Sequence, residues 1–465
     1  MGEKVGKGDR EVVRSRVARG GALARVAASQ ITRDIGAQVA TIGQPSDVRR
    51  KRRDAAAVTA VEQLVNVLGS MKGGATKIGQ MLSMLDLSAL PKAYRIPLQE
   101  RLGPLCDSVP EVGFEQMRRE IESGIGAPLS ATFAEFDPAP VGSASIGQVY
   151  RATLHDGRDV AVKVKYPGID QAVEADVKNL VAFVKFWRRA LPAVAAKEFI
   201  SELRETLQNE LAYEAEAVNQ HRAAKLYAGH PFIVVPDSVR EFSSANVLVT
   251  EWVAGESSQS WDALDQSGRN RLGEILFRFY VGGIYRHREF CADPHPGNVL
   301  VRADGTVGFV DFGSYKFMTD ADVAFETAAW NAAAVGDADE LHRLAIEGGL
   351  IDTDSPISAE RCLEYAIHAY GWQMSDKVTD ARGADGAILQ MFDVRDTEFD
   401  GFRAMNYPPA HVFSRRVDLF TTTMLRSLQA SANWYAIASE WMSDAQPATE
   451  LGLLEQQWRH SRTTK

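Results

Sequence analysis

The stretch CADPHPGNVLVRADGTVGFVDFG, residues 291 to 313, combines carboxylates and an amide with small and apolar residues. Asp293 and Asn298 are spaced as D-x-x-x-x-N, and Asp311 opens the string DFG. The segment between them alternates around an Asp-Gly pair, which predicts a β-hairpin that returns Asp311 beside Asn298. Carboxylate and amide oxygens are ligands that Mg²⁺ prefers, and Asp293 would orient an acceptor. We expect His295, between two prolines, to form a loop hydrogen bond rather than to bind metal.

A strand lysine is a second part that a nucleotide phosphotransferase needs, because a cation must contact the phosphates. The segments QVYRATL and DVAVKVKY alternate on either side of the turn HDG, which predicts an antiparallel hairpin. Val160, Val162 and Val164 then share one face of the strand, and Lys163 points to the other. A solvated strand lysine is the plainer interpretation. Lys165 points the same way and is a rival for the role.

A loop of small residues, VGSASIGQVYRA at 141–152, immediately precedes that strand. It takes the position of a phosphate-covering loop, with contacts expected from Gly142, Ser143, Ala144 and Ser145. Alanine and serine replace glycines of the G-x-G-x-x-G pattern. Small side chains still let the backbone approach a ligand closely, although alanine disfavours positive φ. An ordinary small-residue turn is the alternative.

Two glutamates on a predicted helix are candidates to hold the lysine in place. The segment QNELAYEAEAVN contains Glu210 and Glu216, and either carboxylate could pair with Lys163. Helices contain many glutamates, so the residues alone leave this choice open.

The order of the predicted elements indicates the architecture. We predict a basic arm over 1–53, a helical extension over 54–130, a small antiparallel sheet with inserted helices over 131–256, and a mostly helical lobe over 257–465. This is an α+β, two-lobed protein-kinase-like fold. The loop, lysine, glutamate, D-x-x-x-x-N and DFG are weak signals separately, but in this order they predict a nucleotide-binding core.

Composition narrows the classes of function. The 465-residue chain is 45% hydrophobic and 24% charged, which is globular, and its net charge of −9 argues against nucleic acid as a partner. Three widely spaced cysteines show no metal or disulfide pattern, so we expect a reducing, cytoplasmic location. We find no apolar run long enough to span a membrane.

The arm differs in charge from the rest of the chain. Residues 1–53 carry 13 Lys and Arg against 5 Asp and Glu, a balance of +8, which leaves −17 for the remainder. A flexible, solvated tail is one interpretation. The other is a helix that rests on an anionic lipid surface, at the inner face of the membrane, or on an acidic partner.

A further motif, KIGQ at residues 77–80, lies in the helical extension and is followed by MLSM. With ADPHPGN and VDFG, it makes residues from about 60 to 335 resemble the UbiB/AarF family of atypical kinase-like proteins, also called ADCK-like. KIGQ matches the family's K-x-G-Q motif, which lies outside the ordinary kinase parts. VGSAS looks like the family's Ala-rich loop, although the usual three alanines read Gly142, Ser143 and Ala144 here.

The resemblance implies ATP or ADP with Mg²⁺ as cofactors. The roles that it implies are phosphate contact by Lys163, ion pairing with it by Glu210, adenine contact by the backbone of Glu251 to Val253, the catalytic position for Asp293, and Mg²⁺ binding by Asn298 and Asp311.

The helix motif departs from the family pattern. The usual E-x-D reads Glu210-Leu211-Ala212, while Glu216 is kept, so we expect Lys77 of KIGQ to lean on Glu210 or Glu216. A helix carrying KIGQ across the cleft would occupy the place where a protein substrate docks.

Three functions therefore stay open. The first is an ATPase or atypical kinase coupled to membrane lipid, typically in isoprenoid quinone biosynthesis, acting as a homodimer or with biosynthetic-complex partners. The second is a small-molecule phosphotransferase similar to aminoglycoside or choline kinases. The third is a non-catalytic scaffold gated by nucleotide.

Overall fold

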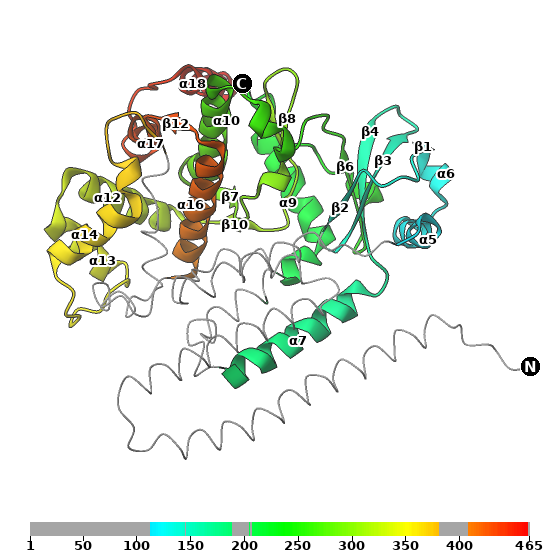
Figure 1. The fold of residues 1–465 in the computed structure, drawn as a ribbon, viewed down its shortest axis with the longest axis horizontal. Coiled ribbons are helices and arrows are strands. Elements are labelled where there is room, and N and C mark those ends of the chain that lie inside the picture. The colour runs from blue at the N-terminus through cyan, green and yellow to red at the C-terminus, as the bar shows by residue number, and fades with distance from the viewer. Residues whose placement is uncertain (1–111, 145, 188–203, 205–206, 381–407, 464–465) are drawn as a thin grey trace, which may run out of the picture. The chain divides into compact units, whose positions relative to one another are not determined.

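The computed structural model describes residues 112–144, 146–187, 204, 207–380 and 408–463 (Figure 1). The chain divides into two compact units, one of residues 1–108 and 172–200, the other of residues 109–171 and 201–465. The described part of the first unit, 172–187, continues helix α7 (Ile169–Trp187). The predictions made for the basic arm, for KIGQ and for most of the helical extension concern residues outside the described ones.

The predicted antiparallel sheet is present in the second unit and has five strands. The strand order is β1-β3-β4-β6. The short strand β2 pairs with the N-terminal part of β3, and β1 pairs with the C-terminal part. Their bounds are β1 (Phe133–Phe136), β2 (Gly142–Ala144), β3 (Gly147–Leu154), β4 (Asp159–Lys165) and β6 (Val247–Glu251). In β4, Val160, Val162 and Val164 are fully buried, which confirms that Lys163 lies on the opposite face.

Helix α5 (Phe114–Ile125) packs on this sheet and is followed by the single turn α6 (Leu129–Thr132) (Figure 1). Met117 and Ile121, one turn apart, are its buried side chains. The helix ends at Gly126, whose φ of 77° is left-handed, a conformation that glycine adopts without strain.

The hairpin predicted within residues 291–313 is confirmed. Strands β8 (Val299–Val301) and β9 (Val307–Phe309) pair antiparallel, and Gly305 has the positive φ, 78°, that the turn requires. Strands β7 (Glu289–Cys291) and β10 (Tyr315–Phe317) pair on either side of it.

One strand lies in a different sheet from the one expected. The segment 232–253 lies within the range predicted for the antiparallel sheet and contains two strands, but β5 (Ile233–Val234) pairs in parallel with β9 in a three-stranded sheet of order β5-β9-β8. Only β6 joins the five-stranded sheet. A two-residue strand can satisfy its backbone in either place, and the alternating pattern does not specify which.

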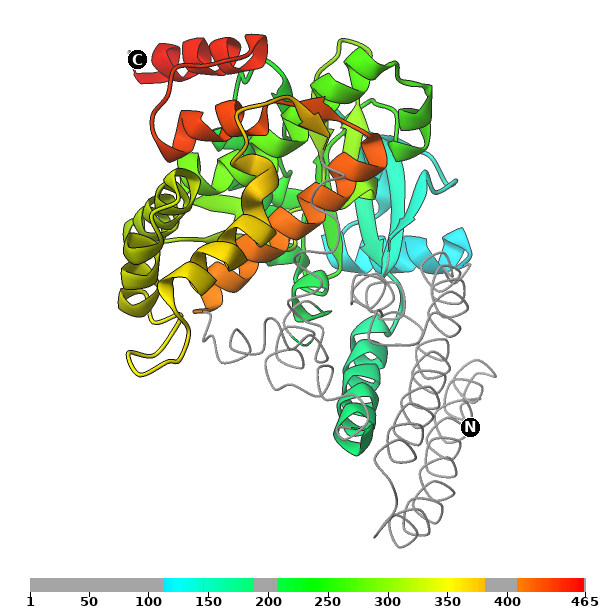
Figure 2. The ribbon, with the colours of Figure 1, turned by 60° about the vertical axis from the view of Figure 1, so that its left-hand side comes forward.

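The rest of the unit is mostly helical, as predicted (Figure 2). The larger helices are α9 (Tyr213–Leu226), α10 (Gln266–Phe277), α11 (Gly283–His287), α12 (Asp320–Val335), α13 (Ala338–Glu347), α14 (Ala359–Tyr370), α16 (Pro409–Leu428), α17 (Trp434–Met442) and α18 (Glu450–Thr463). A short strand pair, β11 (Thr379–Asp380) with β12 (Ser431–Ala432), completes it. Helix α10 packs along α16, and Phe277, Phe309, Phe312 and Trp434 lie in one hydrophobic core.

A π-helical turn, Arg278–Gly282, joins α10 to α11, and it contains a fully buried arginine. Arg278 forms ion pairs of 2.8 Å with Glu274, Glu440 and Glu455. A buried guanidinium needs this many acceptors, because an uncompensated charge in the interior is strongly destabilising. The pairs connect α17 and α18 to α10, the helix that precedes the loop of Asp293 and Asn298.

Candidate nucleotide-binding and catalytic site

Lys163 of β4 lies at the centre of the candidate site. Its Nζ donates hydrogen bonds of 3.1 Å to both carboxylate oxygens of Glu216 and lies 3.9 Å from Oδ2 of Asp311. The lysine side chain is 18% exposed and that of Asp311 is 22% exposed, so both can still be reached from outside. Burial works against the charge of Lys163, but Glu216 and then Asp311 hold its pKa well above the ordinary value. The lysine is therefore a fixed cation.

The partner of Lys163 corrects the role implied by resemblance. Glu216 accepts both hydrogen bonds, and the charge of Glu210 also raises the pKa of Lys163 by a smaller amount. The predicted single helix is interrupted, because Ala212 has a non-helical ψ of 59° and α9 begins at Tyr213. The rival Lys165 is buried and forms an ion pair of 2.9 Å with Asp170.

Helix α9 also carries two side chains that the sequence reasoning missed. Asn219, one turn after Glu216, donates a hydrogen bond of 3.3 Å to the carbonyl of Phe312 in the DFG string. The buried ring of Tyr213 lies under the ammonium of Lys163, 5.0 Å from its centroid. The helical spacing from 216 to 219 was the available signal, since residues three apart share a face.

The hairpin brings the two predicted metal ligands together, as expected. The N–H of Val310 donates to the carbonyl of Asn298 at 3.2 Å, so Asn298 and Asp311 lie at neighbouring positions. Oδ1 of Asp311 accepts a hydrogen bond of 3.0 Å from the N–H of Gly313. Phe312 is fully buried in the hydrophobic core, which fixes the backbone on both sides of it. Oδ2 of Asp311 faces Lys163.

These residues fit a magnesium ion that also binds phosphate oxygens. Mg²⁺ is commonly held by one or two protein oxygens together with substrate phosphates. Asp311 and Asn298 provide such oxygens from adjacent, partly exposed positions. Among the described residues, no group of three or more His, Cys, Asp or Glu side chains is placed to hold a metal alone. His295 accepts a hydrogen bond of 3.1 Å from the N–H of Gly297, which confirms its predicted loop role.

Asp293 follows β7 and has an unexpected partner. Its Oδ1 accepts a hydrogen bond of 3.0 Å from Nη2 of Arg416 on α16, and both side chains are less than 10% exposed. Sequence reasoning did not identify Arg416, which lies 123 residues downstream among other helical arginines. The contact with Arg416 therefore joins the loop after β7 to helix α16.

The small-residue loop folds as a tight hairpin rather than an open loop. Gly142, Ser143 and Ala144 form β2, which pairs with the start of β3, and Ser145 lies outside the described residues. Gly147 is essential to this geometry, because a Cβ there would lie 2.1 Å from the carbonyl oxygen of Val164 on β4.

The predicted hinge joins the five-stranded sheet to the β8–β9 hairpin. Glu251 ends β6, and its carboxylate accepts a hydrogen bond of 3.0 Å from the N–H of Asp237. Val253 is buried against Gly308 of β9, where a Cβ would meet the valine at 2.6 Å. Glu256 then exchanges two backbone hydrogen bonds with Val301 of β8. The hinge segment therefore contacts the two strands that Asn298 precedes and Asp311 follows.

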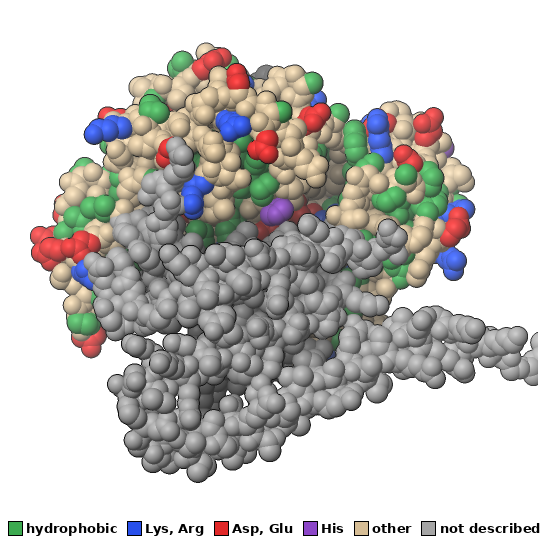
Figure 3. Space-filling model, in the orientation of Figure 1, with side chains coloured by type: hydrophobic (Ala, Val, Ile, Leu, Met, Phe, Trp, Pro, Cys, Tyr) green, Lys and Arg blue, Asp and Glu red, His purple; other side chains and the backbone are tan. Residues whose placement is uncertain are grey.

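Two observations concern the predicted contact with a membrane: the distribution of surface charge and the character of the helices. On the face shown in Figure 3, charged side chains of both signs are interspersed over the described residues. Every helix in the described ranges is too short or too polar to cross a membrane. Lys77 and the basic arm lie outside the described part of the chain.

Comparisons with known proteins agree with this geometry. A family model described as the ABC1 atypical kinase-like domain matches residues 104–345. The mitochondrial atypical kinase COQ8B of Rattus norvegicus is 32% identical over 282 residues, which cover 60% of this chain and 52% of that protein. AarF domain-containing protein kinase 1 of Xenopus laevis is 27% identical over 289 residues, 61% of this chain and 55% of that protein. The chain thus spans about half the length of these curated relatives.

A solved structure is also similar. Rv3197 of Mycobacterium tuberculosis, determined in complex with erythromycin, superposes with a TM-score of 0.60 and 29% sequence identity. The similarity covers 86% of this chain and 98% of that one. At this identity and coverage, the two chains share a kinase-like fold.

Proposed function

This chain belongs to the UbiB/AarF family of ABC1 atypical kinase-like proteins, and we propose that it binds Mg-ATP or Mg-ADP and uses the nucleotide in membrane-lipid metabolism. The observation that carries the proposal is the arrangement of Lys163, Glu216 and Asp311, with Nζ 3.1 Å from one carboxylate and 3.9 Å from the other. Binding of a nucleoside triphosphate requires an ammonium group beside a carboxylate that can bind the metal ion, and this pair of side chains meets that requirement.

Each side chain has a part in the proposed chemistry. Lys163 contacts the phosphates, and Glu216 keeps its ammonium aimed at them. The backbone of Glu251 to Val253 meets adenine, and the β2–β3 hairpin covers the phosphates. Asp293 accepts the proton of water or of an acceptor hydroxyl. Bound Mg²⁺, held by Asn298 and Asp311, would supply neutralising charge to the phosphate oxygens.

A Mg-nucleotide binding experiment tests this site. Wild-type protein should gain thermal stability with Mg-ATP or Mg-ADP, because a ligand that binds only the folded state stabilises it. Asp311→Asn should abolish the magnesium-dependent part of that gain. Asp304→Asn is the matched control, because this exposed aspartate contacts only its own hairpin, where it accepts from Thr306 and pairs with Arg302. An unchanged response in Asp311→Asn would refute the assignment of the site.

The coupling to lipid is a separate part of the proposal. It rests on the basic arm, with its balance of +8, and on the family resemblance to proteins of isoprenoid quinone biosynthesis. Liposome flotation with anionic lipids, using the full chain and a chain lacking residues 1–53, measures the arm's role. Equal flotation of the two would remove the arm from the proposal.

The rate of Mg-ATP hydrolysis distinguishes an enzyme from a non-catalytic scaffold. Mg-ATP hydrolysis should rise with anionic liposomes or isoprenoid additives, and Asp293→Asn should lower it. Nucleotide binding without any turnover under these conditions would favour the scaffold. Light scattering of the same samples measures whether the chain is a homodimer.

A second candidate is binding of a macrolide or a similar small molecule. It rests on the similarity to the Mycobacterium tuberculosis protein solved with erythromycin, whose chain is covered to 98%. Erythromycin should then stabilise this chain in a thermal melt. Transfer of phosphate to it, or to an amino-alcohol, at ordinary kinase rates would favour the small-molecule phosphotransferase.

A further inference from the structure

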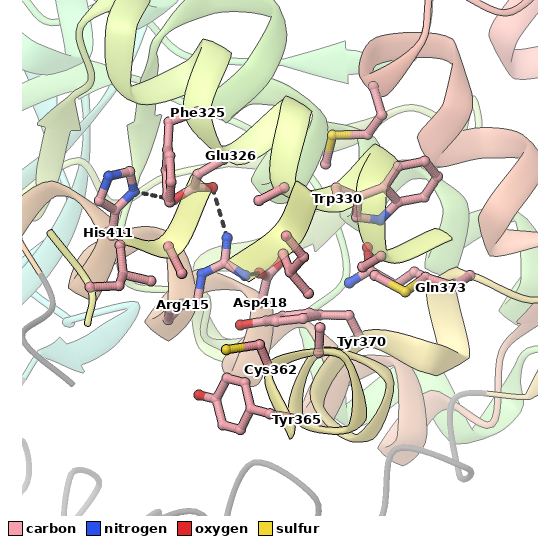
Figure 4. Close-up of a pocket in the computed structure, with 18 of the residues that line it drawn as sticks. Phe325, Glu326, Trp330, Cys362, Tyr365, Tyr370, Gln373, His411, Arg415 and Asp418 are labelled. Atoms are coloured by element: carbon pink, nitrogen blue, oxygen red, sulfur yellow. Dashed lines mark hydrogen bonds and ion pairs between the residues drawn. The ribbon is translucent and has the colours of Figure 1, made fainter. Parts of the chain in front are cut away.

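A cavity lies in the helical lobe, among residues that the proposed nucleotide site does not use. It has a volume of about 110 Å³ and lies between α12, α14 and α16 (Figure 4). Most of the lining is apolar, with Phe325, Trp330 and Tyr365 among its aromatic side chains. An engineered apolar cavity of about 150 Å³ holds one benzene ring, so this one is suited to a molecule of about that size or smaller.

The cavity has a charged floor whose groups are bound to one another. Figure 4 shows Glu326, Arg415 and Asp418 in the middle of the lining. The carboxylate of Glu326 accepts from Arg415 and from His411, each at 2.7 Å, and from the hydroxyl of Tyr285 at 2.9 Å. Arg415 also pairs with Asp418 at 3.3 Å. These groups are therefore already satisfied by the protein.

One polar group on the wall is not satisfied. Trp330 is 93% buried, and its Nε1–H has no hydrogen-bond acceptor among the described residues. Figure 4 shows the indole nitrogen turned toward Gln373 and the interior of the lining. One face of the indole ring stacks on Tyr435, with 5.6 Å between the two ring centroids. This contact fixes the orientation of the indole. A buried donor without an acceptor costs free energy that a ligand acceptor would recover.

The charges of the floor select against anions. Two carboxylates, Glu326 and Asp418, face one guanidinium and one imidazole, so the floor has no excess of positive charge. Burial raises the pKa of Asp418 to about 7, although Arg415 opposes this rise, which indicates that the site poorly tolerates added negative charge.

We propose that this cavity is a binding site for a small, uncharged ring-sized molecule that carries one hydrogen-bond acceptor, which receives the Nε1–H of Trp330. The aromatic and sulfur-containing walls contact the ring, and the donor fixes its orientation. The site is independent of the proposed nucleotide site, and its occupancy can be measured without nucleotide.

Three single-ring probes separate the contributions of the acceptor and of the charge, and benzamide, which has the size of benzoate without its charge, controls for the larger size of benzoate. Pyridine has a ring and an acceptor, benzene has the ring alone, and benzoate adds a negative charge. With ¹⁵N-labelled tryptophan, the indole N–H resonance of Trp330 should move downfield and saturate with pyridine. Benzene should bind roughly three- to tenfold more weakly, the value of one hydrogen bond, and benzoate should not bind.

Two variants and a control complete the test. Trp330→Phe should reduce the affinity for pyridine to that for benzene, and Ala333→Leu should abolish both by filling the cavity. Trp458→Phe is the matched control, because that indole already donates to the carbonyl of Ala228 at 3.1 Å. The proposal is overturned if neither neutral ring gives a saturable shift, if benzoate binds as well as pyridine, or if Ala333→Leu binds pyridine like the wild type. If Trp330→Phe does not fold, the probe series and Ala333→Leu still decide the matter.

Discussion

Replacement of Arg416 by methionine tests whether the contact with Asp293 holds the candidate catalytic carboxylate. The hydrogen bond from Nη2 to Oδ1 is 3.0 Å long, and both side chains are almost completely buried. Methionine keeps the length and apolar character of the side chain but removes the charge. Asp293 then stays buried without its cation.

The magnitude follows from burial and distance. Two unit charges about 4 Å apart attract by about 4 kcal/mol at the effective dielectric constant of a protein. Removal of one member of a buried pair costs about 3–5 kcal/mol, because the remaining charge is left in the interior. We therefore expect Arg416→Met and Asp293→Asn each to lower the free energy of unfolding by about that amount. The double variant should lose less than the sum, by about 2 kcal/mol or more.

Urea denaturation followed by circular dichroism measures all four proteins of this cycle. Arg343→Met is the matched control, because Arg343 pairs with Glu340 and Glu347 on an exposed helix surface, where solvent screens the charges and the loss should be much smaller. Arg416→Lys keeps the charge without the planar fork and should recover part of the loss. Single effects that add to within about 0.5 kcal/mol would refute the reasoning, because additivity indicates no direct coupling.

Three other changes have defined outcomes. Glu216→Gln should weaken Mg-ATP binding by about tenfold or more in calorimetry, since a hydrogen bond to a charged group contributes about 1.5–3 kcal/mol, whereas Glu210→Gln should have a smaller effect. Gly147→Ala should lower the free energy of unfolding by about 3 kcal/mol, because its Cβ meets a backbone oxygen, while Gly142→Ala has nothing within 4 Å and should be neutral in the same urea assay. Burial opposes ionisation of Glu326, but Arg415 and the adjacent donors lower its pKa from 4.5 to about 2. The folded pKa is below the unfolded one, so this stabilisation of roughly 3 kcal/mol is complete above pH 4.5 and is lost as pH falls through 2. Urea midpoints from pH 6 to pH 2.5 should fall less steeply in Glu326→Gln, and an identical slope would contradict the assignment.

Local patterns predicted the parts of the site that depend on neighbouring residues. The alternation in β4 placed Lys163 opposite its valines, and the Asp-Gly turn predicted how Asp311 returns to Asn298. Both depend on period and turn chemistry within about ten residues. The pairing of Lys163 with Glu216 could not be derived in this way, because the break at Ala212 changes which glutamate faces the sheet.

Contacts between segments far apart in the chain could not be predicted from the sequence. Arg416 contacts Asp293, which lies 123 residues earlier in the chain. The sequence of α16 does not distinguish Arg416 from Arg415, which faces the cavity of the helical lobe instead. The two neighbours point to different sites because successive residues on a helix are about 100° apart. Likewise, β5 is too short for its pattern to choose between two sheets.

The buried Arg278 has a consequence for synthesis of the chain. Two of its three carboxylate acceptors, Glu440 and Glu455, leave the ribosome more than 160 residues after Arg278. Until they do, Glu274 is the one of these three acceptors that the guanidinium can reach. The helix before the Asp293 loop cannot reach its final packing in a nascent chain that ends before α18, and the lobe stays exposed to chaperones and proteases until α18 has been synthesised. A ribosome that stalls anywhere between the DFG string and residue 455 would therefore release a polypeptide that contains every proposed nucleotide ligand but lacks a stable lobe to hold them.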